Sequence, residues 1–332
     1  MKAIQLAGPG RLEVVEQEKP RPGPGEVLVR IKAVGLCGTD LHLFQGIFGE
    51  FPIIPGHDAA GVIEETGPGV DQKRTGARVT IDPAGCCLRS ADPGPLCPNC
   101  RVGRTNLCEG ATYMGMTSPG ALAQYLTVPA ARAVDLPESI TDQGATVLEP
   151  VVVGLHLLEQ TADRPGRAMI IGGGPIGLVA ALMLQSQGRR VTLLEPIASR
   201  RGLAQELGLE EAVGPADLTG LHPAGLIVET SGHPSASETV VAAAQPGATV
   251  VLVGGPTDIP GLVILTRELE VRAVKGGRGL YPQAVEWVTA QGLDLGGLIS
   301  HVFPVAQAET AFKKTIGSPE RIFRSVLETD RW

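Results

Sequence analysis

The fold is decided by one stretch of the sequence, Ala168–Gly177, which reads AMIIGGGPIG. Its first four residues are apolar and predict a strand, and the apolar run 176–187 predicts the helix that follows. The spacing G-x-G-x-x-G is typical of dinucleotide binding when it joins a strand to a helix. Gly172 permits the tight turn, Gly174 lets the backbone approach a pyrophosphate, and Gly177 lets the helix pack on the strand. The free N–H groups at the helix start would then bind the phosphates.

A carboxylate at the end of the next predicted strand, 191–195, indicates which dinucleotide binds. Glu195 can accept hydrogen bonds from both adenosine ribose hydroxyls, and its charge would repel a 2′-phosphate, so we predict NAD. Arg200 would either lie over the adenine or accept a 2′-phosphate. The alternative is a glycine turn kept for packing, with Glu195 at the surface. The residues expected to bind the cofactor are Gly172, Gly174, Pro175, Ile176, Gly177, Glu195 and Arg200.

Strands and helices alternate around this stretch. We predict strands over 168–171, 191–195, 226–229 and 249–253 and helices over 145–160, 176–187, 199–207 and 235–244. This alternation predicts an α/β fold with a doubly wound parallel sheet. The preceding residues instead indicate strands over 12–15, 26–34 and 61–66, and a long loop over 82–110. Near the end we expect helices over 282–290 and 305–316 and a strand over 325–328.

Length, charge and composition exclude several classes of protein. A chain of 332 residues suggests about two domains. Its net charge of -7 and its 3% of aromatic residues argue against nucleic acid as a partner. No apolar run reaches the length of a membrane span, and Met1–Leu6 lacks the features of a signal peptide. We therefore expect a cytoplasmic protein that acts on a small molecule.

The six cysteines all lie in the first third of the chain, which indicates metal or thiol chemistry rather than disulfides. Cys37 begins the run CGTDLH, His57 stands in GHDAAG, and Glu149 stands in LEP. Thiolate, imidazole and carboxylate are the protein ligands of zinc, and a catalytic zinc keeps one position open. Taken alone, Cys37 would be a buried apolar residue and His57 a turn residue. Their occurrence together with a dinucleotide turn favours a catalytic metal.

On these motifs the sequence resembles the zinc-dependent medium-chain dehydrogenase/reductase family over nearly its whole length, and the polyol and threonine dehydrogenase branch in particular. The resemblance implies a co-chaperonin-like β-barrel catalytic domain over 1–145, with a structural zinc lobe at 82–110. It further implies a Rossmann domain over 146–280 and a return to the catalytic domain over 281–332. Relatives of this kind form dimers or tetramers, so a homodimer or homotetramer is expected.

The resemblance also implies roles for the motif residues. Cys37 and His57 match zinc ligands, and Thr39 and His42 match a proton relay. Asp58 stands where the family has a longer glutamate, and Glu149 matches a second carboxylate position. Two carboxylates beside one thiolate would give the zinc site a net negative charge. We therefore expect one of them to ligate the metal and the other to stand one step away, without a choice between the two.

A second zinc is expected in the lobe. The spacing of Cys97, Cys100 and Cys108 matches the last three ligands of the family's structural zinc, but Gly94 occupies the position of the first. Cys87 in a longer loop is preferred to Cys86 as the missing ligand. The alternative is a lobe that has lost its metal. The expected cofactors are thus NAD and two zinc ions per chain.

These features predict an enzyme that oxidises an alcohol or polyol, or reduces the matching carbonyl, with NAD as hydride carrier. One alternative is a zinc-free quinone or enoyl reductase, but such enzymes lack the set of Cys37, His57 and Glu149. Another is a nucleotide-sensing protein without catalysis, which would not need the Thr39–His42 relay. Arg278 lies where related enzymes bring a residue towards the substrate, although a solvated loop arginine is equally expected.

Overall fold

The structure is a computed structural model that describes residues 1–92, 94–164, 166–220, 222–255, 257–330 and 332. It consists of two compact units, each described here by itself. The barrel unit contains Met1–Glu149 and Gly277–Trp332, and the nucleotide unit contains Pro150–Gly276. The two units are defined by which residues pack against one another. The division into functional domains after residues 145 and 280 stays a prediction.

The nucleotide unit is built on a six-stranded sheet in which every pairing is parallel. The strand order is β12-β11-β10-β13-β14-β15, so the sheet grows outward in both directions from β10. This is the strand order of the Rossmann fold, whose crevice opens where the order reverses, between β10 and β13. The strands are β10 (Ala168–Ile171), β11 (Val191–Leu194), β12 (Glu211–Val213), β13 (Ala224–Glu229), β14 (Ala244–Leu252) and β15 (Glu270–Ala273).

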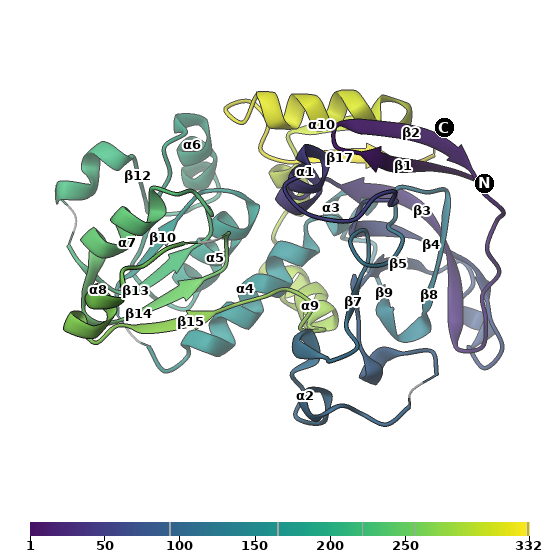
Figure 1. The fold of residues 1–332 in the computed structure, drawn as a ribbon, viewed down its shortest axis with the longest axis horizontal. Helices are drawn as coiled ribbons and strands as arrows, with labels where there is room; N and C mark the ends of the chain where they lie inside the picture. Colours follow the sequence, from purple (N-terminus) through teal and green to yellow (C-terminus); the bar gives the residue numbers. More distant parts are fainter. Residues whose placement is uncertain (93, 165, 221, 256, 331) are drawn as a thin grey trace. The chain divides into compact units, whose positions relative to one another are not determined.

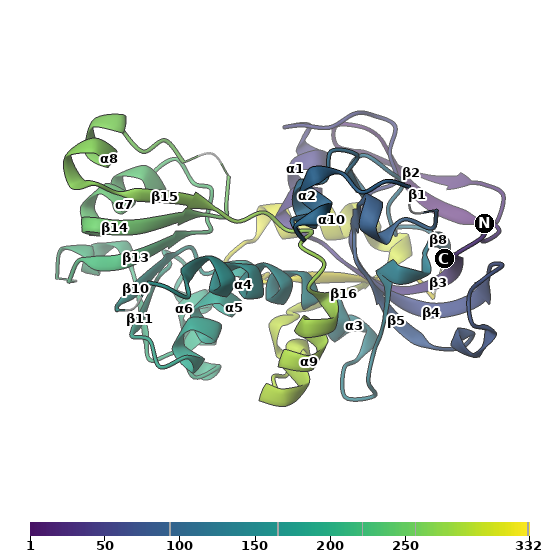
Figure 2. The same cartoon turned by 90° about the horizontal axis from the view of Figure 1, so that it is seen from below.

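Helices surround this sheet, as the green and teal ribbons show (Figures 1 and 2). All four residues of β10 and of β11 are buried, as expected for strands covered on both faces. The prediction of a doubly wound α/β fold is therefore confirmed. The helices are α4 (Leu148–Thr161), α5 (Pro175–Ser186), α6 (Ala198–Glu206), α7 (Ala236–Ala243) and α8 (Gly261–Arg267), with a 3-10 turn at Pro215–Gly220.

The barrel unit contains a seven-stranded sheet. Six strands follow the order β16-β17-β3-β4-β5-β9, and β8 pairs with β3. The long strand β3 is the hub, because it pairs with β4, β8 and the late strand β17. The strands are β1 (Lys2–Gly8), β2 (Arg11–Glu16), β3 (Glu26–Gly35), β4 (Asp58–Thr66), β5 (Arg78–Ile81), β6 (Ala84–Gly85), β7 (Thr112–Tyr113), β8 (Tyr125–Pro129), β9 (Ala133–Asp135), β16 (His301–Pro304) and β17 (Ser325–Glu328).

One core holds this unit together. It joins residues from β1, β3, β4 and β5 to Phe303, Phe312 and Leu327 of the C-terminal segment. The rings of Phe44 and Phe312 lie 5.1 Å apart in it. The helices are α1 (Gly38–Gln45), α2 (Pro98–Arg101), α3 (Asp142–Ala145), α9 (Tyr281–Gln291) and α10 (Ala308–Gly317), and 3-10 turns lie at Gln72–Arg74, Cys87–Arg89, Thr105–Leu107, Ala130–Arg132, Leu295–Leu298 and Val305–Gln307.

The helix predicted over 145–160 is present as α4, which begins three residues later than predicted, because Ala145 ends the separate short helix α3. The reason lies in the backbone. Pro150 has no N–H group, so the carbonyl oxygen of Thr146 has no helical donor four residues later. That carbonyl instead accepts a hydrogen bond from the guanidinium of Arg324. Proline is tolerated at its actual place, the first turn of α4.

None of the helices in the described part of the chain is long and apolar enough to cross a membrane.

Candidate metal centre and cofactor turn

Three of the predicted ligands meet at one edge of the barrel sheet. Cys37 is the N-cap of α1, two residues after the end of β3, and His57 immediately precedes Asp58, the first residue of β4. Because Gly35 of β3 pairs with Asp58, the sheet register itself brings the two segments together. One ligand atom from each of Cys37, His57 and Asp58 lies within 4.8 Å of the others. We call these three residues the ligand cluster.

Asp40 orients the imidazole of this cluster. Its carboxylate accepts hydrogen bonds from the backbone N–H groups of Cys37, at 2.9 Å, and Gly56, at 3.1 Å. One carboxylate oxygen also lies 3.5 Å from Nδ1 of His57. Burial lowers the pKa of His57, but the Asp40 and Asp58 carboxylates outweigh it and hold this pKa well above its usual range. Nδ1 lies closest to the Asp40 carboxylate but makes no hydrogen bond within the described residues, while Nε2 is the nitrogen turned towards Asp58.

Arg324 is a buried cation behind the cluster. Its guanidinium lies 2.5 Å from one carboxylate oxygen of Asp58, and the side chain of Arg324 is 2% exposed. Gly35 makes room for it, because a Cβ atom there would stand 2.6 Å from the guanidinium. The other carboxylate oxygen of Asp58 is buried without a hydrogen-bond partner and lies 3.8 Å from Nε2 of His57. A buried, unpaired anionic oxygen beside a thiol and an imidazole is what a zinc site requires.

The remaining predicted residues surround the cluster but are not part of it. Glu149 is buried, and burial together with the Asp58 carboxylate raises its pKa to about 7. Thr39 lies next to the cluster, since its hydroxyl accepts from the Cys37 thiol at 3.9 Å. His42 is exposed on α1. Within the described residues, no hydrogen bond joins Thr39 to His42, so their relay stays a prediction.

Asp40, Tyr113 and Arg324 complete the surroundings of the cluster, and the sequence analysis did not single them out. The Tyr113 ring meets the His57 ring edge-on, with 5.7 Å between the ring centres. Asp40 lies inside the quoted run CGTDLH, so a carboxylate three residues after Cys37 was a usable signal. Tyr113 and Arg324 had no signal, because they reach the cluster from remote segments.

The cysteine lobe, residues 82–110, holds a second cluster. One sulfur atom from each of Cys87, Cys97, Cys100 and Cys108 lies within 4.8 Å of the others. The sulfur of Cys108 lies 3.8 Å from that of Cys87 and 3.9 Å from that of Cys97. A tetrahedral zinc with Zn–S bonds of about 2.3 Å separates its sulfurs by about 3.8 Å, so the four thiols fit the metal. Cys86 is buried beside them but outside the group.

Backbone N–H groups point at these sulfurs. The sulfur of Cys97 accepts from the N–H of Cys100 at 3.5 Å, and the sulfur of Cys87 accepts from the N–H of Cys97 at 3.4 Å. Such bonds favour the thiolate, and the N–H groups of Glu109 and Cys100 lower the pKa of Cys97 to about 6. The thiolate is thus favoured at Cys97, whereas burial and the neighbouring cysteines raise the pKa of the Cys100 thiol.

The lobe is fastened to the segment that precedes α9. Within the lobe itself, Arg89 pairs with the buried carboxylate of Asp82 at 3.1 Å. Two hydrogen bonds then join the lobe to that segment. The Thr105 hydroxyl donates to the carbonyl of Arg278 at 2.9 Å, and the Arg278 guanidinium donates to the carbonyl of Gly103 at 2.6 Å. Arg278 is therefore held by the lobe, and its predicted contact with substrate stays a prediction.

The glycine turn has the geometry that its sequence predicts. Gly172 has a φ of 98°, which other residues rarely adopt, and a Cβ atom on Gly177 would stand 1.9 Å from the carbonyl oxygen of Gly172. Gly174 is the N-cap of α5, with Pro175 and Ile176 in its first turn. The carboxylate of Glu195 accepts from the N–H of Gly173 at 2.6 Å.

The end of β11 fixes this carboxylate further. Glu195 also accepts from the N–H of Ile197 at 2.8 Å, and the guanidinium of Arg200 lies 3.9 Å from it. Arg201 donates to the backbone carbonyl of Glu195 at 2.7 Å. A negative charge is thus held beside the turn at which a dinucleotide's ribose would lie.

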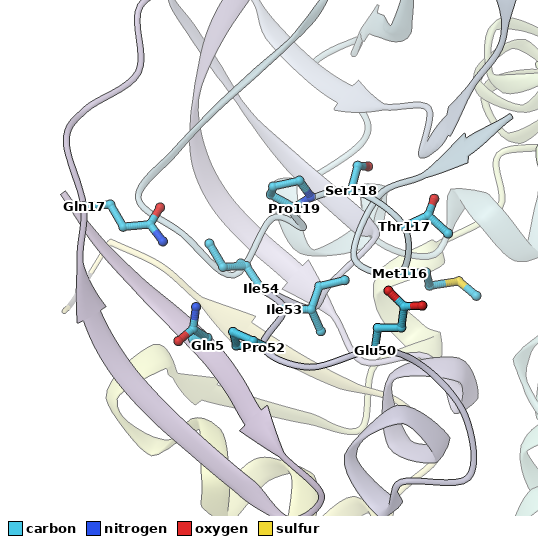
Figure 3. Close-up of a pocket in the computed structure, with 10 residues that line it drawn as sticks. All are labelled: Gln5, Gln17, Glu50, Pro52, Ile53, Ile54, Met116, Thr117, Ser118 and Pro119. Carbon is cyan, nitrogen blue, oxygen red and sulfur yellow. The ribbon is translucent and has the colours of Figure 1, made fainter. Parts of the chain in front are cut away.

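The barrel unit has a separate cavity of about 340 Å³. Figure 3 shows Glu50 beside Met116 in its wall, with Gln5 and Gln17 farther away. None of the predicted site residues lines it. The lining residues are Gln5, Gln17, Glu50, Pro52, Ile53, Ile54, Met116, Thr117, Ser118 and Pro119.

Comparisons with known proteins agree with this geometry. Residues 23–138 match the family model of the alcohol dehydrogenase GroES-like domain. Residues 175–290 match the family model of the zinc-binding dehydrogenases. The first range contains the ligand cluster and the cysteine lobe, and the second begins in the glycine turn.

Individual relatives match over almost the whole chain. The starvation-sensing protein RspB of Escherichia coli K12 is 30% identical, over 95% of this chain and 96% of its own. Sorbitol dehydrogenase of Gallus gallus is 31% identical, over 94% of this chain and 92% of its own. The crystal structure of the rspB alcohol dehydrogenase of E. coli CFT073, complexed with NADH, superposes with a TM-score of 0.89 at 27% identity and covers 99% of both chains.

Proposed function

Since the chain belongs to the family of zinc-containing medium-chain alcohol and polyol dehydrogenases, we propose that it oxidises a hydroxyl group of a small polyol and passes the hydride to NAD. The observation that carries this proposal is the ligand cluster, with its buried, unpaired Asp58 oxygen beside Cys37 and His57. A zinc-free reductase has no use for such a group. The similarity to sorbitol dehydrogenase supports a polyol as substrate.

We propose that Cys37, His57 and Asp58 hold the catalytic zinc. When bound, the metal would act as a Lewis acid that favours the alkoxide form of the substrate. Asp40 keeps His57 in place, and Arg324 balances the charge of Asp58. Glu149 lies outside the three-residue group, so we assign it the role of the second, outer carboxylate. Thr39, next to Cys37, would accept the substrate proton and pass it towards His42.

We propose NAD rather than NADP as cofactor, held by Gly172, Gly174, Pro175, Ile176 and Gly177 at the start of α5. The fixed carboxylate of Glu195 supports this choice because it would repel a 2′-phosphate. We also propose a second, structural zinc on Cys87, Cys97, Cys100 and Cys108, supported by the spacing of their sulfurs.

NADH formation by the purified zinc-loaded protein tests this function, across polyols, diols, secondary alcohols and L-threonine. We expect turnover of at least one polyol, and loss of both turnover and one zinc in Cys37→Ala. A Cys86→Ala variant is the matched control, because Cys86 is a buried cysteine outside both ligand groups. Activity that survives in zinc-free protein, or a complete lack of turnover with every alcohol class, would refute the proposal.

We propose that the protein forms a homodimer through the edge of the nucleotide sheet. In the described part of the chain β15 pairs only with β14, and Val271 on β15 is 41% exposed. The neighbouring helix α8 exposes Leu262 by 70% and Leu265 by 74%. An open strand edge beside exposed apolar side chains suits pairing with a second copy. Light scattering should find a dimer that Leu265→Asp weakens, and a monomeric wild type would contradict this assembly.

The cytoplasm is the proposed compartment. All six cysteines carry free thiols, as expected where thiols stay reduced.

A further inference from the structure

Tyr113 is held rigidly next to the ligand cluster. It lies on β7, where it pairs with Ala84 of β6. Its N–H donates to the Thr117 hydroxyl at 2.7 Å, and its carbonyl accepts from the N–H of Met116 at 3.1 Å and of Thr117 at 2.9 Å. These bonds fix the backbone of Tyr113, and its ring packs edge-on against His57.

A glycine lies beside this ring. A Cβ atom on Gly277 would stand 3.6 Å from Cε2 of Tyr113 and 2.7 Å from the side chain of Ala84. The backbone of the segment before α9 therefore passes close to the ring, and a side chain at position 277 would crowd it.

The phenol of Tyr113 shares its surroundings with the groups of the metal site. The Glu149, Asp58 and Cys37 side chains lie close enough to act on it electrostatically. A phenol is neutral at ordinary pH, so its hydroxyl is able to donate. Among the described residues it makes no hydrogen bond, although the backbone of Tyr113 makes several. A phenol fixed in this way offers a donor and an acceptor to a ligand.

We propose that Tyr113 is a specificity-determining residue, whose hydroxyl binds the substrate hydroxyl on the carbon next to the one that is oxidised. The enzyme would then prefer vicinal diols to simple alcohols. This inference rests on the proposed function, which places the reacting oxygen at the ligand cluster. A substrate oxygen one carbon farther along would face the walls of that site, and the Tyr113 ring forms such a wall against His57.

The chain has only three tyrosines, and the other two are suited as controls. Tyr281 is 2% exposed, and its hydroxyl is buried without a partner. Tyr125 lies on β8, where its ring packs under the ammonium group of Lys19 at 4.4 Å. Tyr113 is partly buried, and of the three tyrosines it is the one whose ring contacts a residue of the ligand cluster in the described part of the chain.

The test compares Tyr113→Phe, Tyr281→Phe and Tyr125→Phe in the zinc-loaded enzyme with NAD. The substrates are 2,3-butanediol and 2-butanol, which differ by one neighbouring hydroxyl. We expect Tyr113→Phe to lower kcat/KM for the diol by roughly 5- to 10-fold, as for one neutral hydrogen bond, and mainly through KM. Turnover of 2-butanol should change by less than about 2-fold, and zinc content and Tm should be unchanged because phenylalanine keeps the ring. Tyr125→Phe should alter none of these values.

The outcomes are separable. Equal losses with both alcohols in Tyr113→Phe, or a loss of zinc, would show that the residue only supports His57 and would overturn the inference. So would diol selectivity that disappears in Tyr281→Phe instead. A wild-type enzyme that turns over neither these alcohols nor any in the wider series would refute the proposed function itself.

Discussion

The guanidinium of Arg324 lies 2.5 Å from the carboxylate of Asp58, a residue 266 positions earlier in the chain. Both side chains are almost completely buried. Asp58 therefore offers one oxygen to its cation and keeps the other unpaired towards Cys37 and His57. The ion pair thus orients the Asp58 carboxylate towards the proposed metal position, at a place where the resembled family has a longer glutamate.

Loss of the cation should leave a buried, uncompensated charge. We expect Arg324→Met to lower the free energy of unfolding of the metal-free protein by about 3–5 kcal/mol, and Asp58→Asn to restore part of that loss in the double variant. Denaturant titration measures both effects. Arg321→Met is the control, since the side chain of Arg321 is 83% exposed and should matter by less than about 0.5 kcal/mol. Additive losses in the double variant would contradict the pairing.

Metal analysis should show that the proposed zinc site of the lobe uses the four-thiol group and not Cys86. Cys100→Ser should reduce the fully loaded enzyme from about two zinc ions per chain to about one, and should loosen the lobe, because site formation and loop order are one equilibrium. Cys86→Ser should keep both metals, since Cys86 lies outside the four-thiol group. One zinc in the loaded wild type, or a loss caused by Cys86→Ser, would be the contrary result.

The stability of the zinc-free protein should depend on pH through Glu149. Burial and the Asp58 carboxylate raise the pKa of Glu149 in the folded protein to about 7, above the ordinary value of 4.5. The folded state thus holds this proton more tightly, so the stability it contributes is present below about pH 4.5 and is lost as the pH rises through about 7. Glu149→Gln should make the free energy of unfolding fall less between about pH 5 and pH 8 than in the wild type. Equal falls in both proteins would argue against this environment for Glu149.

The choice between NAD and NADP should follow the charge of Glu195. Removing that charge in Glu195→Ser leaves Arg200 and Arg201 near the ribose position, so kcat/KM for NADP relative to NAD should rise by roughly 10-fold or more. Glu206→Ser is the control, because Glu206 lies exposed at the end of α6. An unchanged cofactor ratio, or equal use of both cofactors by the wild type, would reject the assignment.

Local patterns in the sequence predicted much of this structure. The strands 168–171 and 325–328 begin and end where predicted, because apolar runs bounded by turns leave little choice. Helix α1 was not predicted, since its residues GTDLHLFQ carry weak helical periodicity and start from a cysteine cap. The edge strand β15 was also missed, because its alternation of exposed residues is spread over only four positions.

The residues of the candidate site were likewise predicted only in part. Cys37, His57 and Cys97 belong to short motifs, so they could be predicted as ligands from the family that those motifs resemble. Arg324 was not, because its partner lies in a different strand and only the pairing of β17 with β3 brings them together. Long-range partners of this kind depend on the tertiary fold, which no local pattern encodes.

The pairing of β17 with β3 also sets an order of events during synthesis. The nucleotide unit is one continuous segment, Pro150–Gly276, and a nascent chain can complete it while the C-terminal segment is still being made. The barrel sheet cannot close at that stage, because its hub strand waits for Ser325–Glu328. Until the ribosome has released that strand, Asp58 has no counter-ion and one edge of β3 next to it is unpaired. The proposed metal site is therefore among the last parts of this protein to form, and a zinc ion that arrives earlier would find its ligands not yet assembled.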